Sequence, residues 1–208
     1  MKNIHSQESG RSMVEMLGVL AIIGVLSVGG IAGYSQAMSR FKVTKTIDQI
    51  QQMVTNIRTL YGSQKNYVGI NKNSTMYSVG VFTDENCTEG STCATPINPY
   101  GGTITLKVLK DDAGRNSRAF AIAYDGLPSD ACTRLAIQDW GDASSGFIAI
   151  SASTAAASVA NQAPNATSTT GVTTAVSALQ TTPMNIDMAA TGCGTARGTA
   201  SSVILYYK

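Results

Sequence analysis

The sequence predicts an α+β fold in which one long N-terminal α-helix packs on an antiparallel β-sheet. Three features predict it: an uncharged apolar run near the N-terminus, an amphipathic helical pattern after it, and short alternating segments in the second half. The 208 residues are enough for one ordinary domain and a membrane segment, but too few for two large domains.

The apolar run is long enough to cross a membrane. No charged residue occurs from Met16 to Ser39. A helix of this length would span roughly 36 Å, whereas a bilayer core of about 30 Å needs about 20 apolar residues. A cleaved signal peptide has a shorter apolar region, of about 7–15 residues. We therefore expect a membrane-spanning helix rather than a signal peptide or the core helix of a soluble protein.

An amphipathic pattern follows Arg40. Apolar residues recur at alternating spacings of three and four residues at Val43, Ile47, Ile50, Val54, Ile57 and Tyr61. This is the stripe of a helix with one buried face. We expect a continuous helix from about Met13 to Tyr61 that ends at Gly62, and its second half needs a globular domain to cover the stripe.

The rest of the chain predicts a sheet. Residues 63–99 are polar and show little periodicity. Strands are expected at Thr103–Leu109, Ala119–Tyr124, Gly146–Ser151 and Ser201–Tyr207. A short helix can start at Pro128 and continue to about Gln138, with Cys132 on it.

Four cysteines, Cys87, Cys93, Cys132 and Cys193, lie outside the apolar run. An even number of this kind predicts two disulfides and an oxidising compartment, although four cysteines allow three pairings. The sequential pairing, Cys87–Cys93 and Cys132–Cys193, is favoured because it closes a short loop and separately closes the C-terminal region. A zinc site is not expected, because no CxxC pair occurs and no histidine is near.

The composition argues against catalysis and nucleic-acid binding. The net charge of +2, with 13% charged residues, gives no field strong enough to suggest nucleic acid as the main partner, although one basic patch on the fold stays open. The single histidine, His5, lies in the polar N-terminal segment, away from any site it could serve as a base or metal ligand. The close carboxylates at Asp111–Asp112 and Asp139/Asp142 lack a nucleophile motif or phosphate loop. We expect no catalytic residue, metal or cofactor.

Residues 10–15 read GRSMVE and precede the apolar run MLGVLAIIGVLSVGGIAGY. This arrangement resembles the type III signal of type IV prepilins. The resemblance implies that a prepilin peptidase cuts after Gly10, that the mature chain begins at Arg11 with a methylated N-terminus, and that Glu15 is the family's glutamate. Arg11 departs from the family pattern, which usually has Phe, Met or Leu there.

A carboxylate at the edge of an apolar helix demands a partner, because a charge in lipid costs a few kcal/mol. In a filament, the α-amino group at Arg11 of an incoming subunit can lie beside Glu15 of a neighbour. Removing one partner of such a buried pair costs about 3–5 kcal/mol, so Glu15 is expected to set the axial register. Gly29 and Gly33 form a small-xxx-small pair that permits close helix packing.

The second half of the chain carries a looser resemblance. The order of PINPYGGTITL, GLPSDACTRLA and a late cysteine before a final strand resembles the type IVb pilins. That resemblance implies a C-terminal disulfide loop that bounds the most exposed surface, and Cys132 and Cys193 match its disulfide by position.

No charged residue occurs between Asp142 and Asp187, where Ala, Ser, Thr and Asn dominate. This composition is compatible with a disordered linker. The segment nevertheless lies inside the Cys132–Cys193 loop and contains the apolar residues Val159, Val172, Val176 and Leu179. We favour a compact, uncharged surface for subunit packing.

The resemblance to type IV pilins implies the following organisation: a leader at residues 1–10, a transmembrane and filament-core helix at 11–39, an amphipathic half-helix at 40–62, and a globular head at 63–208 with a disulfide-bounded region at 132–193. The expected function is a structural subunit of a type IVb-like pilus that serves adhesion, aggregation, motility or conjugation. Its expected partners are identical subunits in a helical homopolymer, the prepilin peptidase and the assembly machinery. The expected location is the bacterial inner membrane for the precursor and an extracellular filament afterwards.

Three alternatives remain open. The chain can be a minor pilin that acts as a binding module at a filament tip, or a plain membrane-anchored exported domain that never polymerises. It can also be a type II secretion pseudopilin, although the acidic cluster of that family's common calcium site is not evident here.

Overall fold

The computed structural model describes residues 9–87, 92–111, 113–142, 144–159, 178–180, 183–194 and 200–208, with the backbone alone at 9–12 and 178–180. The elements follow in the order α1 (Ser9–Tyr61), α2 (Asn73–Ser78), β1 (Ile104–Leu109), β2 (Ala119–Pro128), α3 (Ser129–Ala136), β3 (Phe147–Ser153), β4 (Ala178–Gln180), α4 (Ile186–Cys193) and β5 (Ala200–Tyr207). Two compact units divide the chain, Met1–Phe41 and Lys42–Lys208. The described part of the first unit is called the arm, and that of the second unit is called the head.

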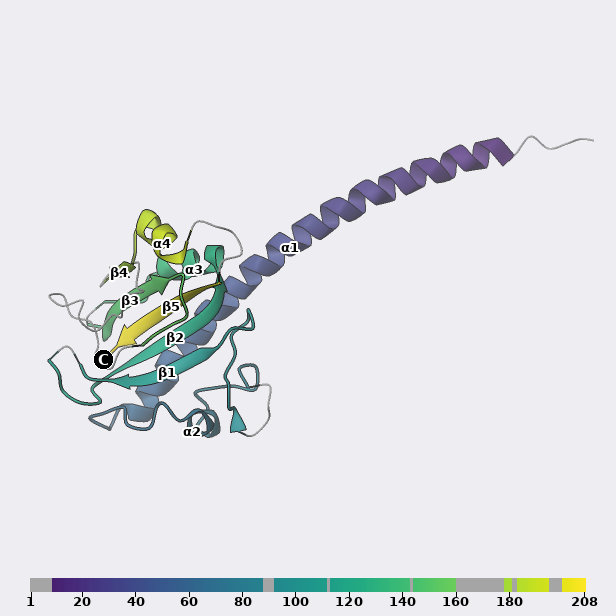
Figure 1. The fold of residues 1–208 in the computed structure, drawn as a ribbon. Helices are drawn as coiled ribbons and strands as arrows, with labels where there is room; N and C mark the ends of the chain where they lie inside the picture. Colours follow the sequence, from purple (N-terminus) through teal and green to yellow (C-terminus); the bar gives the residue numbers. More distant parts are fainter. Residues whose placement is uncertain are drawn as a thin grey trace, which may run out of the picture. The chain divides into compact units, whose positions relative to one another are not determined.

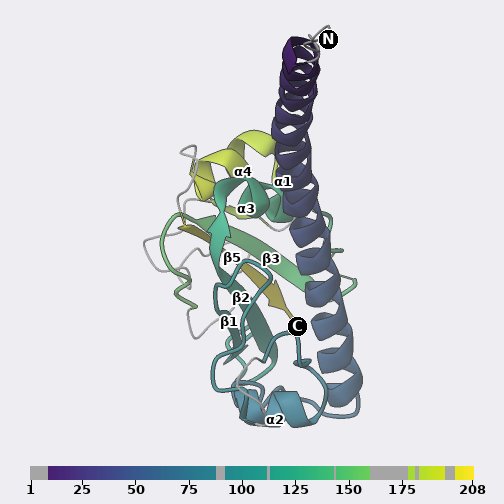
Figure 2. The same cartoon turned by 90° about the vertical axis from the view of Figure 1, so that its right-hand side faces the viewer.

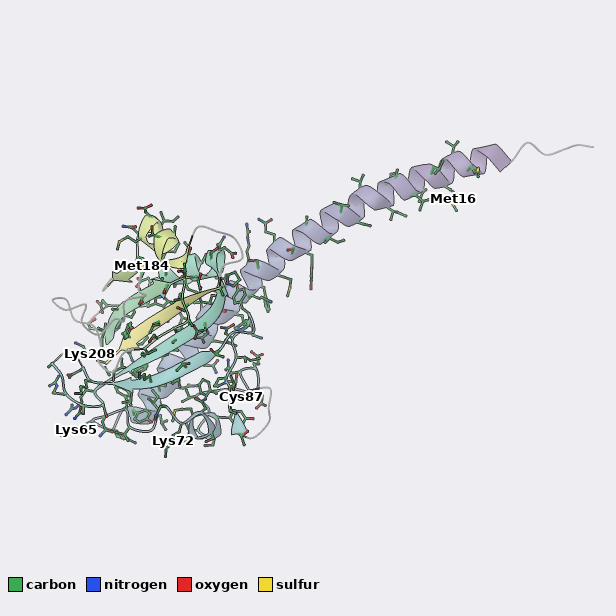
Figure 3. All side chains as sticks on the ribbon, in the orientation of Figure 1. Met16, Lys65, Lys72, Cys87, Met184 and Lys208 are labelled. Atoms are coloured by element: carbon green, nitrogen blue, oxygen red, sulfur yellow. A yellow bond between two sulfur atoms is a disulfide. The ribbon has the colours of Figure 1, made fainter. Side chains whose placement is uncertain are left out.

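The arm consists of the first part of α1, which begins at Ser9 rather than at about Met13. Its sequence contains no proline, so no backbone donor is missing within the helix. The large apolar side chains from Met13 to Tyr34 are all 51–75% exposed. Figure 3 shows these side chains, with Met16 labelled, along the helix. The arm therefore forms a regular helix without burying its apolar surface in the chain.

The second half of α1 belongs to the head and buries the predicted stripe. Val43, Ile50, Val54, Ile57 and Tyr61 are buried, and Ile47 is partly buried. Thr46, Gln49 and Met53 are also buried, because a helix that lies on a sheet covers a wider face than one row of side chains. The helix ends at Tyr61 as predicted. A side chain at Gly62 would come within 3.0 Å of the Arg58 carbonyl oxygen, so a larger residue would crowd the last turn.

Five antiparallel strands form one sheet in the order β1-β2-β5-β3-β4. The last strand, β5, lies between β2 and β3, and Leu205 pairs with Ile122 on one side and Ile150 on the other. Figure 1 shows β5 in yellow within the sheet. Seven of the eight β5 residues are buried, as expected of a central strand that is covered on both faces.

The two faces of the sheet have different cores. On one face, Phe120, Ile122 and Tyr124 join Leu205 and the α1 stripe in the main hydrophobic cluster, and Figure 2 shows α1 alongside this face. The alternate residues form a second cluster of Leu109, Ala119, Ala121, Ala123, Ala149, Ile204 and Tyr206. This division follows from the period of two along a strand. The expected helix-on-sheet fold class is confirmed.

Residues 154–159 cross the second face after β3. The Ala157 amide donates to Asp125 Oδ1 (2.5 Å), and the Ser202 hydroxyl donates to the Ala155 carbonyl oxygen (2.7 Å). Val159 packs against the alanine-rich cluster. The first part of the uncharged segment is therefore tied to β2 and β5. Val172 and Val176 lie outside the described residues, and Leu179 lies in β4, where only the backbone is described.

Two short helices and one short strand were not expected from the sequence. Helix α2 has six residues, α4 has eight and β4 has three, too few to show a clear hydrophobic period. The predicted helix after Pro128 ends at Ala136 rather than near Gln138. In both views α2 lies at one end of the head and α3 and α4 lie at the other (Figures 1 and 2).

Candidate functional site

The residues that resemble a processing and assembly signal all lie in the arm. Gly10 and Arg11 are within α1, where only their backbone is described. Glu15 is exposed, and the described residues provide no ion-pair partner for it. An uncompensated carboxylate in an apolar helix is tolerated in water but is costly in lipid. In an apolar environment Glu15 would therefore need a partner from outside the described residues.

The two glycines predicted to pack helices share one side of the arm. Gly29 and Gly33 are one turn apart, and no atom of the chain lies within 4 Å of the position that a Cβ would take at either residue. Each leaves a shallow gap on the helix surface that another helix can approach closely. The described chain does not fill these gaps.

The arm meets the requirements of a membrane span by length and composition. The candidate span is Met13–Tyr61, with a mean hydropathy of 2.2 in its most apolar window and none of that window buried. A buried core helix of a soluble protein reaches similar hydropathy, but its side chains are covered. The complete exposure of this window is what separates the arm from such a helix.

Two disulfides crosslink the head in the sequential pairing. Cys87 and Cys93 form one, with their Cα atoms 4.9 Å apart, and Cys132 and Cys193 form the other, with a Cα–Cα distance of 5.7 Å. The second bond joins α3 to the last residue of α4. The Ser201 hydroxyl donates to the Cys193 carbonyl oxygen (2.7 Å), which ties this end of the head to β5. The C-terminal crosslink is thus built into the core.

Two hollows flank the half of α1 that belongs to the head. One has a volume of 390 Å³ and lies between α1 and the loop that carries Asp84 and Glu85. The other has a volume of 320 Å³ and lies between α1, the segment around Trp140 and the end of β5. Gln49 and Met53 line the first hollow, and Arg58 lines the second.

The first hollow is acidic, and its loop is held in place by hydrogen bonds. The Tyr77 hydroxyl donates to Asp84 Oδ1 (2.5 Å), and this bond, then burial and the Asp84 charge, raise the pKa of Tyr77. Glu85 Oε2 lies 3.0 Å from Lys45 Nζ. The Asn86 side chain accepts from the Thr83 hydroxyl (3.0 Å), which closes the loop on itself. This region presents two ordered carboxylates.

A positively charged side chain, Arg58, lines the second hollow. The Arg58 guanidinium lies over the Tyr207 ring, with its central carbon 5.2 Å from the ring centroid. Burial raises the pKa of Tyr207, while the Arg58 charge opposes that shift. The Trp140 indole donates to the Leu135 carbonyl oxygen (2.8 Å), which fixes its ring beside the hollow. An aromatic floor of this kind suits a guanidinium, which stacks on the face of the ring.

Sequence reasoning did not identify Arg58, Trp140 or Tyr207 as functional residues. These three residues are far apart in the chain, and no motif connects them, so only the folded sheet brings them together. The acidic loop had a weak signal, because the letters DENC precede the first disulfide. Within the described residues, no group of three or more His, Cys, Asp or Glu side chains is arranged to hold a metal ion.

A family model named Bundlin matches residues 36–208 of the chain. The chain belongs to the Bundlin family. The prediction of a type IVb-like pilin is therefore confirmed. The match begins after the GRSMVE segment, so it does not test the resemblance to a prepilin signal.

Two relatives of this Bundlin-family chain are each described as the major structural subunit of bundle-forming pilus. One is from Escherichia coli O111:H- and the other from Escherichia coli O127:H6 (strain E2348/69 / EPEC). Each is 25% identical over 174 residues, which cover 82% of this chain and 86% of the relative.

Two solved structures were also matched. A type IV b pilin from Salmonella typhi has a TM-score of 0.49 and 17% identity, with 78% of this chain and 98% of that chain covered. TcpA, a type IV pilin from the Vibrio cholerae El Tor biotype, has a TM-score of 0.47 and 18% identity, with 80% and 99% covered.

Proposed function

We propose that this chain is a structural subunit of a type IVb-like pilus, held in the bacterial inner membrane as a precursor and packed into an extracellular filament through its arm. The observation that carries the proposal is the exposed apolar arm attached to a disulfide-crosslinked head in a member of the Bundlin family. Apolar surface of this extent is unfavourable in water. Lipid before assembly and neighbouring arms after assembly would both remove it from water.

In this proposal a prepilin peptidase removes residues 1–10, and the new α-amino group at Arg11 is methylated. That amino group pairs with Glu15 of a neighbouring copy in the apolar filament core. The absence of a partner for Glu15 among the described residues supports the pairing. Gly29 and Gly33 then allow a second arm to approach closely. The head forms the outer shell, and residues 132–193 bound part of its surface.

The proposal includes no catalytic activity, cofactor or nucleic-acid partner. The Bundlin family is a family of structural pilins. The titratable groups that the described residues bring into the two hollows are three carboxylates, one arginine and one tyrosine, without a histidine or free thiol. That inventory is suited to ionic contacts between proteins.

The experiment is to express the full chain with its assembly machinery, shear the cells, image the sheared fraction and sequence the N-terminus of its main subunit. Filaments composed mainly of a chain that begins RSMVE are expected. Trace incorporation would instead favour a minor pilin at the tip. A chain that stays in the membrane, with no filament, would favour an anchored domain and contradict the proposal.

Glu15→Ala tests the assembly step separately from insertion. We expect normal membrane insertion and loss of filaments, because the incoming amino group loses a partner that is worth about 3–5 kcal/mol in an apolar core. Val14→Ala, at the neighbouring exposed position, is the control and should assemble normally. A normal filament yield from Glu15→Ala would rule out the proposed pairing.

A further inference from the structure

The Arg58 guanidinium lacks an ionic partner among the residues that the structure describes. Its Nη2 atom is buried, and no hydrogen-bond acceptor contacts it among the residues that the structure describes. A buried donor on a charged group is costly when it is unpaired, and native structures rarely leave one without a reason. The Arg58 side chain as a whole is only partly buried and lines the second hollow, so an anion from another molecule can approach the guanidinium from that hollow.

Glycine at position 146 allows the Arg58 guanidinium to lie close against the backbone. Gly146, with φ of 78°, lies beside the guanidinium, and a Cβ there would fall 2.6 Å from Nη2. Asp139 lines the same hollow, but its Oδ1 accepts from the Gly141 amide (2.9 Å), and it forms no ion pair with Arg58 in the described structure. The walls of Trp140 and Tyr207 exclude water from one side of the cation, which strengthens its attraction for a carboxylate.

The acidic hollow has a carboxylate that is easily exchanged. Glu85 has a side chain that is 61% exposed, and its ion-pair partner, Lys45, is itself 35% exposed. A surface pair of this kind contributes about 0–1 kcal/mol. Moving Glu85 from Lys45 to a half-buried guanidinium on an aromatic ring would therefore cost little and gain a stronger contact.

Three other described carboxylates already have partners within the head, which makes them less suited to this role. Asp111 is buried and paired with Arg115, Asp125 accepts from the Ala157 amide, and Asp142 accepts from the Ser144 hydroxyl. Glu85 combines high exposure, a longer side chain and a position at the edge of a hollow.

The two hollows lie on opposite flanks of one helix. Gln49 and Met53 line the acidic hollow, whereas Val54 and Arg58 line the basic one. With 3.6 residues per turn, these pairs point to roughly opposite sides of α1. A helical polymer joins copies through two different surfaces of each subunit, and opposite charges on two such surfaces favour this arrangement.

We propose that Glu85 of one copy enters the Arg58 hollow of the next copy. Opposite flanks of α1 in two neighbouring subunits then form one heterologous contact between their head domains. This contact rests on the proposed pilus function and names the residues that join the heads. The partner is a second copy of this chain, because the required carboxylate lies on the flank opposite the hollow that receives it.

The test is a charge exchange in the full chain, expressed with its assembly machinery. Arg58→Glu and Glu85→Arg are each expected to lower the filament yield by about tenfold or more, since each places two like charges in the contact. The double variant restores the attraction with the charges reversed and should recover most of the wild-type yield. Asp139→Asn is the matched control and should assemble normally, because Asp139 is not the partner.

A crosslinking test covers the case in which a charge variant fails to fold. Thr55 is exposed and lines the Arg58 hollow, so Thr55→Cys combined with Glu85→Cys should give a ladder of disulfide-linked subunits from sheared filaments. Lys72→Cys combined with Glu85→Cys is the control, because Lys72 is exposed outside both hollows, and it should give no ladder.

The outcomes separate the two proposals. If the wild-type chain forms no filaments, the proposed function is wrong, and so is the proposed contact between heads. If wild-type filaments form, but the exchange does not restore assembly of folded single variants, or the Thr55→Cys pair gives no ladder, the contact between heads is wrong while the pilus function stands. Normal assembly of both single charge variants would also overturn the contact.

Discussion

The arm and the head share helix α1, but its apolar side chains are exposed in the arm and buried in the head. In the arm, Ile22 and Ile31 are 63% and 71% exposed, whereas Ile50 and Ile57 in the head are fully buried. Both halves are regular α-helix. The difference shows that helix formation and apolar burial are separate problems. The head buries its stripe against its own sheet, and the arm depends on a second molecule or a bilayer.

Placing an aspartate in each half of α1 should give the largest difference between the arm and the head. Ile50→Asp places a carboxylate in the fully buried core of the head, where an unpaired charge costs many kcal/mol, and we expect the head not to fold. Ile23→Asp places the same charge on the exposed arm. There we expect a folded head but impaired membrane insertion, since an aspartate near the centre of a bilayer costs about 2.5–3.5 kcal/mol.

The measurements are protease resistance of the head and the fraction of chain recovered in membranes. The two variants contain the same substitution, so each is the control for the other. A folded head in Ile50→Asp, or an unfolded one in Ile23→Asp, would contradict the division of the chain into an arm and a head.

Removal of the disulfides should affect the head alone. The chain-entropy model gives about 4 kcal/mol for the loop closed by Cys132–Cys193 and about 2.4 kcal/mol for the shorter loop closed by Cys87–Cys93. Replacing each pair by serine should lower the urea midpoint of the full chain in detergent, and the Cys132–Cys193 variant should show the larger drop. Membrane insertion should stay unchanged in both variants. An equal drop in the two variants would argue against loop length as the source of the difference.

A smaller change in the stripe sharpens the same contrast. Ile57→Val removes one methyl group from a fully buried position and should lower the free energy of unfolding by about 0.5–1.5 kcal/mol. Ile31→Val, at a position in the arm that is 71% exposed, should leave head stability unchanged. The midpoint of thermal unfolding, measured on the full chain in detergent, provides the comparison. Equal effects at the two positions would show that the arm also packs on the head.

The smallest expected effect is a dependence of head stability on acid. Burial of Asp111 opposes its ionisation, but hydrogen bonds from the Arg115 and Ala113 amides and the Arg115 side chain more than offset this, so the pKa of Asp111 is lowered. A lowered pKa in the folded state stabilises the head above the usual aspartate range. That contribution disappears as the pH falls through the folded-state value.

Wild-type chain should therefore lose more stability than Asp111→Asn between pH 7 and about pH 3, as measured by the urea midpoint at each pH. Asp48→Asn, at an exposed position on α1, is the control and should follow wild type. Parallel loss in wild type and Asp111→Asn would remove Asp111 as the source of the acid sensitivity.

Much of the fold could be predicted because it depends on local patterns. The spacing from Val43 to Tyr61 defined the buried face of α1, and Gly62 marked its end. Alternation along Thr103–Leu109 and Ser201–Tyr207 indicated two strands to within about one residue at each end. Helix α4 was missed because its eight residues are too few to show a distinct hydrophobic period.

The candidate site residues also divide into those that local sequence patterns reveal and those that only the folded structure reveals. Glu15, Gly29 and Gly33 were identifiable because an acidic residue beside an apolar run and a small-xxx-small pair are visible in the sequence itself. Arg58 was not, because its significance depends on Tyr207 and Trp140, which lie far away in the chain and reach it only after the sheet has formed.

The sequence by itself determined where α1 ends, the apolar surface of the arm, the buried stripe of the second half of α1, and a set of cysteines able to crosslink the head. These properties follow from residue periodicity and composition, which act over a few turns or strands. Only the tertiary structure decided that β5 lies between β2 and β3, and that a cation on one flank of α1 is left without an acceptor in the described chain while an acidic loop lies on the other. Strand order depends on pairing between distant segments, and the local pattern of each strand is compatible with several neighbours.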